Sequence, residues 1–307
     1  MQVFLVLSLI AVFFLILLIL LPTFVISLFL GHRLEQPQHN SIEFGIESQQ
    51  IALLTDDGLT LAAWRTYAES ETPKGTVIIL SGLQMPSVTA FFGYAHMLAE
   101  MGWDALLIEK RARSLSEGEE ISFGIREWLD VKAGVDFLAA DERAGALPIV
   151  AMGTSAGGAT VIIAGGEIPR IDGVIAVSAY ADFVELYVDS IPMFGLPRFL
   201  GRVTVPFMNW NLRARFGSDG LQYTPINGIE RLGQRPILLM HSTEDWQVPF
   251  SHFERLYQTA EAGGISVSTF VREGDWHFVC YDAYVRNPAQ DTAFSQAILA
   301  FLQQFHD

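Results

Sequence analysis

The sequence predicts an α/β fold in which a mostly parallel β-sheet is covered by helices. Three observations predict it. Short apolar runs typical of strands alternate with segments of helical period along residues 49–307. A turn signal, Asp56-Asp57-Gly58, joins the first two of these runs as a hairpin. A serine flanked by glycines follows directly on a buried apolar run and precedes a helical segment.

The predicted strands are short apolar runs that alternate with the predicted helices. The strand-like runs cover residues 49–54, 59–66, 76–80, 105–108, 148–152, 174–178, 236–240 and 266–271. The helical segments cover residues 87–101, 128–140, 156–164, 251–262 and 291–305. The hairpin is expected to form an antiparallel edge, and the later strands, each separated by a helix, are expected to pair in parallel.

The alternation breaks between about residues 182 and 233. This stretch is rich in aromatic residues and contains Pro192, Pro197 and Pro206. A structureless loop of some fifty residues is uncommon in a compact domain. We therefore predict a mostly helical cap inserted over one end of the sheet.

The N-terminal segment is an uncharged apolar run over residues 3–30. As a helix it would extend about 42 Å at roughly 1.5 Å per residue, against a hydrocarbon core of about 30 Å. It lacks the charged start and small-residue cleavage site of a signal peptide. We predict a transmembrane anchor over residues 1–34, a linker over 35–48 and one folded domain over 49–307. Pro22 leaves open a kink, or a shorter span followed by an interfacial stretch.

The anchor predicts a single-pass protein of a bacterial inner membrane. Only Arg33 and Glu35 are charged near the anchor, so the positive-inside rule gives little information about its orientation. Arg33 favours the cytoplasmic side for the domain, and the other side stays open.

The charge balance excludes some partners. The formal net charge of −15 and the lack of clustered Lys and Arg in the sequence argue against nucleic acid as a partner. The same lack disfavours an anionic membrane surface. The single cysteine, Cys280, cannot form an intramolecular disulfide and is interpreted as a small buried apolar side chain.

The segment Gly153-Thr154-Ser155-Ala156-Gly157 matches the pattern G-x-S-x-G between a strand and a helix. This context needs glycines because the turn that exposes the serine hydroxyl is tight. A serine also needs a general base and an acidic partner that orients the base.

The base and the acid are sought after the last two strands. Asp245 follows the strand at 236–240, and His277 follows the strand at 266–271, which gives the chain order Ser, Asp, His. Glu244 remains a rival for the acid, and Asp275 is a weaker one because it is so near His277 in sequence.

With these residues the chain resembles the α/β-hydrolase superfamily, and more narrowly bacterial hydrolases similar to serine aminopeptidases, dienelactone hydrolases and cap-bearing esterases. The resemblance lies in the serine turn, in H-x-x-x-D-x-x-V-P at residues 241–249, in G-x-x-H at residues 274–277 and in the stretch 111–138. It covers roughly residues 50–305 and implies an α/β-hydrolase domain with the cap as an insertion.

The resemblance also implies roles. Ser155 is expected as the nucleophile, His277 as base and then acid, and Asp245 as the orienting carboxylate. The backbone N–H groups of Leu83 and Ala156 are expected to form the oxyanion hole. This chemistry needs no cofactor, and the histidines show no spacing typical of a metal site.

The sequence departs from the family in two places. Ser81-Gly82 stands where relatives often have His-Gly, and Arg111-Ala112-Arg113-Ser114 stands where many have R-G-H-G. The first change keeps the glycine, at Gly82. The second leaves open what geometry the loop at residues 111–114 adopts.

Three functions follow as hypotheses. The first is a serine hydrolase that cleaves a carboxylic ester, a thioester or a small amide, on a small-molecule or lipid-like substrate. The second is an inactive hydrolase-like module that binds a partner at the membrane, supported only by the altered loop. The third is an exopeptidase, for which Glu185 or Asp189 could recognise a free amine.

Overall fold

The computed structural model describes residues 2–30, 33–83 and 86–306, and at residues 2, 3, 11, 14, 17, 25, 26, 28–30 and 219 it describes the backbone alone. Residues 1, 31 and 32 of the predicted anchor and residues 84, 85 and 307 of the predicted domain lie outside the described residues.

Among these residues an eight-stranded sheet forms the centre of the molecule, in the order β1-β2-β4-β3-β5-β6-β7-β8. Strands β1 and β2 form the predicted antiparallel hairpin, β2 also pairs antiparallel with β4, and the remaining neighbours are parallel. The predicted α/β architecture is confirmed. The strands are β1 (Gln49–Leu54), β2 (Thr60–Thr66), β3 (Thr76–Leu80), β4 (Asp104–Ile108), β5 (Ile149–Thr154), β6 (Gly173–Val177), β7 (Ile237–Ser242) and β8 (Val267–Arg272).

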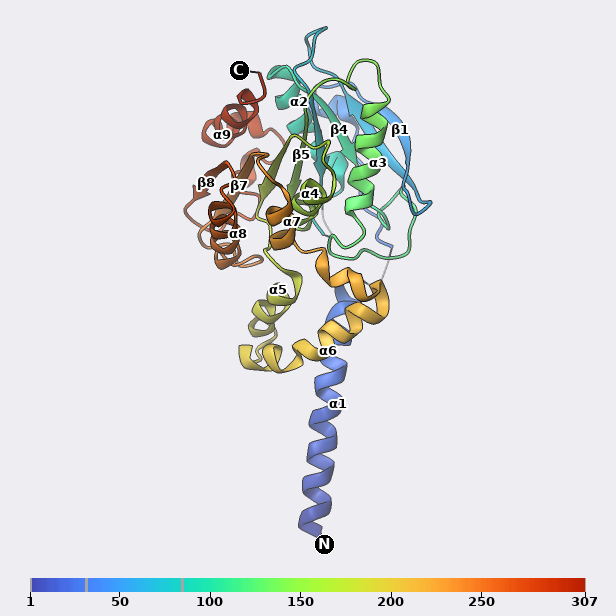
Figure 1. Ribbon diagram of the computed structural model, residues 1–307, viewed down its shortest axis with the longest axis vertical. Helices are drawn as coiled ribbons and strands as arrows, with labels where there is room; N and C mark the ends of the chain where they lie inside the picture. Colours follow the sequence, from blue (N-terminus) through green and yellow to red (C-terminus); the bar gives the residue numbers. More distant parts are fainter. Residues whose placement is uncertain (1, 31–32, 84–85, 307) are drawn as a thin grey trace.

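Two layers of helices cover the sheet (Figure 1). Successive side chains of a strand point to opposite faces, so Ile78 joins the core on one face and Val77 and Ile79 join the core on the other. The first face is covered by α3 (Trp128–Ala139), α4 (Ala156–Glu167), α7 (Pro225–Arg231) and α8 (Ser251–Ala262). The second is covered by α2 (Phe92–Glu100), with η2 (Val88–Phe91) before it, and by α9 (Thr292–Gln303).

The predicted N-terminal helix is present as α1 (Gln2–Leu30), which projects from the body of the molecule (Figure 1). Taking only the residues that are described, no helix is both long and apolar enough to cross a membrane. The helical part of that prediction is confirmed, and the membrane-spanning part is not.

The segment expected to be a linker lies on the domain. Just before it, Leu34, the last residue of the predicted anchor, pairs with the loop after β4 and donates its N–H to the carbonyl of Ala112 over 3.1 Å. A short helix, η1 (Ser41–Phe44), follows, and Phe44 and Ile46 are buried in the core beside α2. Apolar side chains at these two positions explain why this segment packs against the domain.

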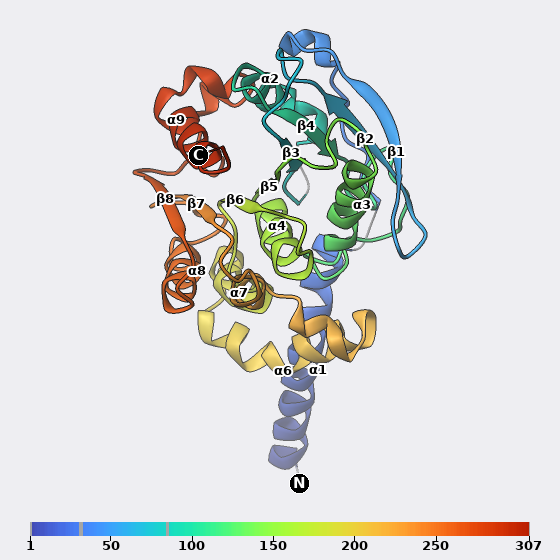
Figure 2. The ribbon, with the colours of Figure 1, turned by 45° about the horizontal axis from the view of Figure 1, so that its top comes forward.

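The chain between β6 and β7 is largely helical. It contains α5 (Phe183–Ser190), η3 (Ile191–Phe194), α6 (Arg198–Phe216), η4 (Ser218–Gln222) and α7. We call α5, η3 and α6 the cap. The cap packs against α1, whereas α7 packs on α4 in the helical layer (Figures 1 and 2).

Candidate active site

Ser155 occupies a strained turn between β5 and α4. Its φ of 57° and ψ of −121° lie outside the regions that side chains with a Cβ normally adopt. Such a residue costs roughly 1–3 kcal/mol, so the surrounding structure must hold it. Its N–H donates to the carbonyl of Val177 over 2.7 Å, which ties the turn to the end of β6. The hydroxyl is thereby presented at the carboxyl edge of the sheet.

The glycines around Ser155 are required by close backbone contacts. A Cβ at Gly153 would lie 2.2 Å from the carbonyl oxygen of Gly157. A Cβ at Gly157 would lie 2.4 Å from the carbonyl oxygen of Ser81 at the end of β3. The absence of side chains lets the first turn of α4 approach both strands, and it brings the N–H of Ala156 close to the segment after β3.

The structure pairs His277 with Asp245. The Nδ1 of His277 lies 2.7 Å from Oδ2 of Asp245, and neither Glu244 nor Asp275 takes that place. Because an ionised carboxylate only accepts hydrogen bonds, the ring proton sits on Nδ1. This leaves the lone pair of the neutral ring on Nε2, where a general base needs it.

Asp245 is held as a carboxylate. Its Oδ1 accepts hydrogen bonds from the N–H groups of Gln247 and Val248 at 2.9 and 3.0 Å. Burial raises its pKa, but the hydrogen bond and charge of His277, with the N–H of Val248, outweigh this and leave the pKa below its ordinary value. Asp245 can therefore orient His277 and stabilise an imidazolium.

His241 lies beneath this pair, buried at the end of β7. Its Nε2 donates to the carbonyl of Val248 over 2.8 Å, and the same nitrogen is 3.8 Å from Oδ2 of Asp245. Burial lowers the pKa of His241, so the ring is neutral and supports the turn that carries Asp245. The sequence pattern H-x-x-x-D contained His241, but the spacing of the pattern does not predict its hydrogen bond to Val248.

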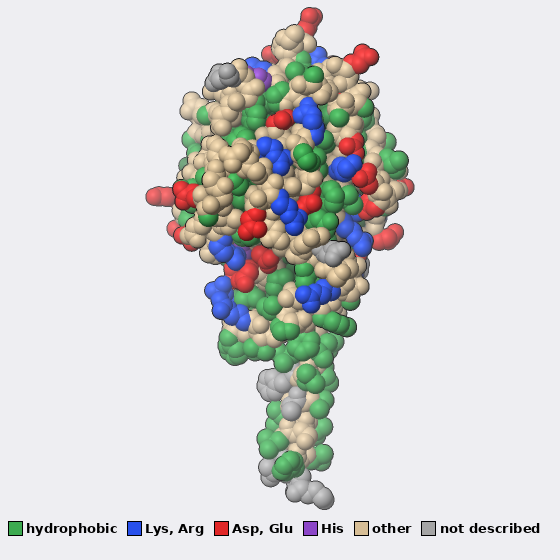
Figure 3. Space-filling view, in the orientation of Figure 1, with side chains coloured by type: hydrophobic (Ala, Val, Ile, Leu, Met, Phe, Trp, Pro, Cys, Tyr) green, Lys and Arg blue, Asp and Glu red, His purple; other side chains and the backbone are tan. Residues whose placement is uncertain are grey.

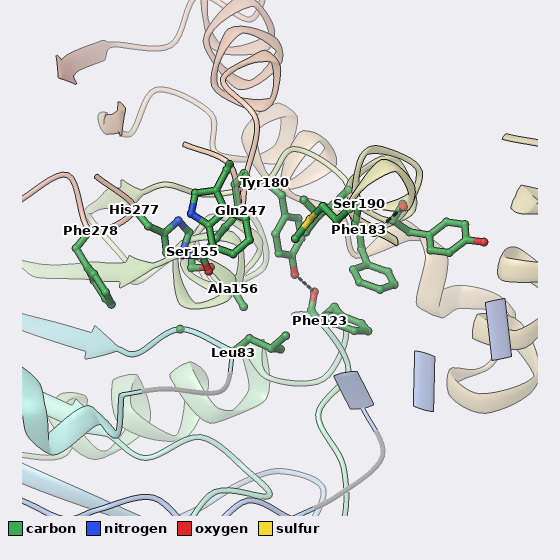
Figure 4. A pocket seen from close by; sticks show the side chains of 16 residues that line it. Leu83, Phe123, Ser155, Ala156, Tyr180, Phe183, Ser190, Gln247, His277 and Phe278 are labelled. Atoms are coloured by element: carbon green, nitrogen blue, oxygen red, sulfur yellow. Dashed lines mark hydrogen bonds between the residues drawn. The ribbon is translucent and has the colours of Figure 1, made fainter. Parts of the chain in front are cut away.

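A cavity of about 390 Å³ lies over Ser155 and His277. Figure 4 shows these two residues at one end of it and Phe183 and Ser190 of the cap at the other. The side chains around it are largely apolar, and none of the sixteen described lining residues is Asp, Glu, Lys or Arg. They are Gly82, Leu83, Phe123, Ser155, Ala156, Tyr180, Phe183, Leu186, Tyr187, Ser190, Met193, Trp246, Gln247, Val248, His277 and Phe278.

The segment after β3 is held by two buried cations that sequence reasoning missed. The Nζ of Lys110 donates to the carbonyl of Gly82 over 2.5 Å, and Arg113 donates from Nε and Nη2 to the carbonyl of Leu83 at 3.1 and 2.8 Å. The C=O of Gly82 and the N–H of Leu83 belong to one planar trans peptide and point in opposite directions. Lys110 therefore fixes the direction of the Leu83 N–H, and Leu83 lines the cavity.

Lys110 is fully enclosed by charged neighbours and backbone. Burial, together with the charge of Arg113, lowers its pKa from 10.5 to about 8, against the opposing effect of Glu127, Glu109 and Asp130. Its charge at neutral pH strengthens the hydrogen bond to Gly82.

Within the part of the chain that is described, no group of three or more His, Cys, Asp or Glu side chains is placed to hold a metal ion.

The serine turn at the carboxyl edge of a mostly parallel sheet, facing a histidine–aspartate pair, defines an α/β hydrolase of the serine hydrolase class. The family model of the prolyl oligopeptidase family (Peptidase_S9) matches residues 122–307, more than half of the chain, and the chain belongs to this family.

Several proteins resemble the chain in sequence, and two of them span different shares of it. The protein YqkD of Bacillus subtilis is 28% identical over 194 residues, which cover 62% of this chain and 61% of YqkD, less than two thirds of its length. The membrane protein YNL320W of Saccharomyces cerevisiae is 23% identical over 250 residues, which cover 76% of this chain and 79% of that protein.

Solved structures share the fold. The Pyrococcus furiosus esterase Pf2001 superposes with a TM-score of 0.70 at 19% identity, covering 90% of this chain and all of that one. A Pyrococcus horikoshii acylaminoacyl peptidase superposes with a TM-score of 0.62 at 16% identity, covering 88% of this chain and 44% of that one. The α/β-hydrolase fold predicted from the sequence is confirmed.

Proposed function

We propose that this protein hydrolyses a carboxylic ester with an apolar acyl group through a covalent acyl-enzyme, with Ser155 as nucleophile, His277 as general base and Asp245 as the residue that orients it. The observation that carries the proposal is the 2.7 Å bond between His277 and Asp245 beside the strained Ser155, in a cavity of about 390 Å³.

The proposed reaction has two halves. Nε2 of His277 accepts the proton of Ser155 while Oγ attacks the carbonyl carbon, and the same nitrogen then protonates the leaving alcohol as the C–O bond breaks. Water repeats the attack on the acyl-enzyme and releases the acid. The N–H groups of Leu83 and Ala156 are proposed to stabilise the oxyanion in both halves, and the N-terminus of α4 adds its dipole.

The cavity favours an ester over a substrate with a free amino terminus. An exopeptidase that recognises a free amine needs a carboxylate near the site, and no described lining residue carries one. Of the two candidates from the sequence, Asp189 is engaged by His252 and Arg198, and Glu185 lies beside Arg255. The cap aromatics instead suit an apolar group.

A second candidate is hydrolysis of an amide whose amino group is blocked by acylation. Such a substrate has no free amine, so the lack of a carboxylate in the cavity does not oppose it. The family and the likeness to an acylaminoacyl peptidase support this candidate.

We also propose that α1 attaches the protein to a membrane, with the hydrolase domain on the cytoplasmic face of a bacterial inner membrane. The large apolar side chains described along α1, such as Phe4, Leu9 and Phe13, are exposed, which is costly in water. The name of the relative YNL320W, a membrane protein, agrees with this. An alkaline carbonate wash should leave the full chain in the membrane pellet, and release into the supernatant would count against attachment.

Fluorophosphonate labelling of the full chain, read by tandem mass spectrometry, tests the nucleophile. We expect one adduct, on Ser155, which is lost in Ser155→Ala and kept in Ser190→Ala, a matched serine of the same cavity. An unlabelled folded protein would favour the inactive binding module.

A substrate series then separates the two chemistries. We expect p-nitrophenyl esters to be hydrolysed with kcat/KM rising with acyl length until the cavity is filled, and aminoacyl p-nitroanilides with free amines to be poor substrates. The reverse order would indicate an aminopeptidase. Activity on N-acetylated aminoacyl anilides above that on esters would favour the second candidate.

A further inference from the structure

The cap helix α6 has two faces of opposite character. Gly201, Thr204, Met208 and Leu212 recur at helical spacing and are buried toward the rest of the cap. The outer face carries Phe199, Val203 and Trp210, which are 61%, 50% and 62% exposed. A helix that buries one face normally shows polar side chains on the other, so an outer face with an exposed phenylalanine, valine and tryptophan needs a reason.

The charge of α6 is also unusual for this protein. The chain has 34 acidic and 19 basic residues, yet the nineteen residues of α6 contain four arginines and no Asp or Glu. Arg198 is bound to Asp189 and Arg215 to Glu120, whereas Arg202 and Arg213 are exposed. The net negative charge of the whole chain, −15, hides this local positive surface.

The outer face of α6 lies where α1 leaves the body of the protein. The two helices pack against each other, and Leu21 of α1 contacts the same apolar cluster as the inner face of α6. In η3, next to α6, Met193 and Phe194 are exposed as well. Figure 3 shows hydrophobic side chains gathered at this base of the cap, with Lys and Arg side chains directly above them.

This arrangement is that of a helix at a membrane interface. Interfacial helices bury aromatic and aliphatic side chains about 5–10 Å into the boundary of head groups and acyl chains, and their basic side chains contact anionic head groups. We propose that α6 seats the cap on an anionic lipid surface, through Phe199, Val203 and Trp210 in the interface and Arg202 and Arg213 at the head groups. The inference rests on the proposed membrane attachment through α1, which brings this face to the bilayer.

The position of Met193 links this surface to the cavity. Its side chain lines the cavity and is also 56% exposed beside Phe194. A cap seated on lipid would place this edge of the cavity against the acyl layer, so a lipid-derived ester could enter without crossing water.

Site-specific fluorescence on the full chain in vesicles tests the proposal. Cys280 is buried, so a single introduced cysteine takes a thiol-reactive NBD label, with the unmodified chain as the labelling control. Labels are placed on α6 in Phe199→Cys and Trp210→Cys, on α1 in Leu9→Cys, and on the distant strand β1 in Leu54→Cys. Vesicles contain phosphatidylcholine with or without phosphatidylglycerol, and nitroxide-labelled lipid is the quencher.

We expect nitroxide lipid to remove about half of the emission at positions 199 and 210 in vesicles with phosphatidylglycerol, as at position 9, and less than about a tenth at position 54. Quenching at position 9 with none at 199 and 210 would overturn the role of α6 and leave the attachment intact. No quenching at position 9 would overturn the attachment and the inference with it.

Charge reversal tests the choice of an anionic surface. Arg202→Glu combined with Arg213→Glu should reduce the quenching at position 199 at least about twofold in vesicles with phosphatidylglycerol. Lys74→Glu, an exposed reversal outside the cap, should leave it unchanged. Equal quenching with and without phosphatidylglycerol, unaffected by the double reversal, would contradict the electrostatic part.

Discussion

Lys110 offers the sharpest test of how the oxyanion site is built. The variant Lys110→Met keeps a long unbranched side chain but removes the ammonium that binds the carbonyl of Gly82. The proposed oxyanion donor, the N–H of Leu83, belongs to the same peptide unit. Its orientation is then no longer fixed by a charge, and its polarisation by the ammonium is lost.

The expected loss follows from the strength of that bond. A hydrogen bond to a charged group contributes about 1.5–3 kcal/mol, and about 1.36 kcal/mol corresponds to a factor of ten in rate. We therefore expect kcat to fall about 10- to 150-fold, with a small change in KM because the bond acts on the transition state. The fall should not exceed the 10²- to 10³-fold typical of losing an oxyanion donor altogether.

The stability of Lys110→Met should change little, for two opposing reasons. The pKa of Lys110 is lowered from 10.5 to about 8, so holding the charge in the folded state costs free energy that is fully present below pH 8 and fades as the pH rises toward 10.5. This lowering of the pKa corresponds to a cost of roughly 3 kcal/mol, which the variant removes. Leaving the carbonyl of Gly82 without its donor costs about 1–3 kcal/mol in return.

The assay is the pH profile of kcat/KM on a p-nitrophenyl ester, with Lys132→Met as the control for an exposed lysine. The wild type should lose activity as the pH rises through about 8, because neutral Lys110 is a weaker donor. That alkaline limb should be absent from Lys110→Met and present in the control. A variant that keeps kcat within twofold of the wild type and loses activity over the same alkaline range would refute this role of Lys110.

Three further predictions follow from the described contacts. Gly157→Ala places a Cβ 2.4 Å from the carbonyl oxygen of Ser81, so thermal unfolding should show a free energy of unfolding lowered by about 1–3 kcal/mol. The control Gly263→Ala, whose nearest contact is 3.4 Å, should be tolerated, and equal melting temperatures of the two variants would contradict the prediction. Asp245→Asn should lower kcat on the order of 10⁴-fold with the fold intact, because the amide no longer fixes the ring tautomer of the base; a loss below tenfold would remove Asp245 from the mechanism. The thiol of Cys280 is buried and its pKa is raised to about 12 by that burial, so Ellman's reagent should react with it only in denaturant; rapid reaction of the folded protein would show that the site opens.

The centre of the sheet could be predicted from the sequence because strands β3, β4, β5, β6 and β7 are buried on both faces. Runs such as residues 77–80 and 148–152 are apolar throughout, and this signal is local. The positions of Ser155, Asp245 and His277 could be predicted for a related reason, since each follows a strand end, and the carboxyl ends of parallel strands meet at one edge. The hydrogen bond between Asp245 and His277 agrees with the choice made over Glu244 and Asp275.

Other features arise only when distant segments meet. The contact of Lys110 with Gly82 joins the ends of β4 and β3, and nothing in the sequence near either residue indicates it. The positive surface of α6 was missed because net charge averages over the chain, so the expectation that an anionic membrane surface is disfavoured did not consider one helix by itself. The packing of residues 35–48 on the domain was not predicted, because a polar segment with Pro37 is typical of a linker.

The altered loop after β4 was the one sequence feature that favoured an inactive module, and its geometry now argues the other way. Relatives often have glycine at the positions of Ala112 and Ser114, and here both residues have positive φ, 56° and 35°. The loop thus keeps a backbone that suits glycine, and Leu34 holds it by accepting from the N–H of Ser114 and donating to the carbonyl of Ala112. Because Arg113 between them binds the carbonyl of Leu83, the changed residues support the proposed oxyanion site and do not dismantle it.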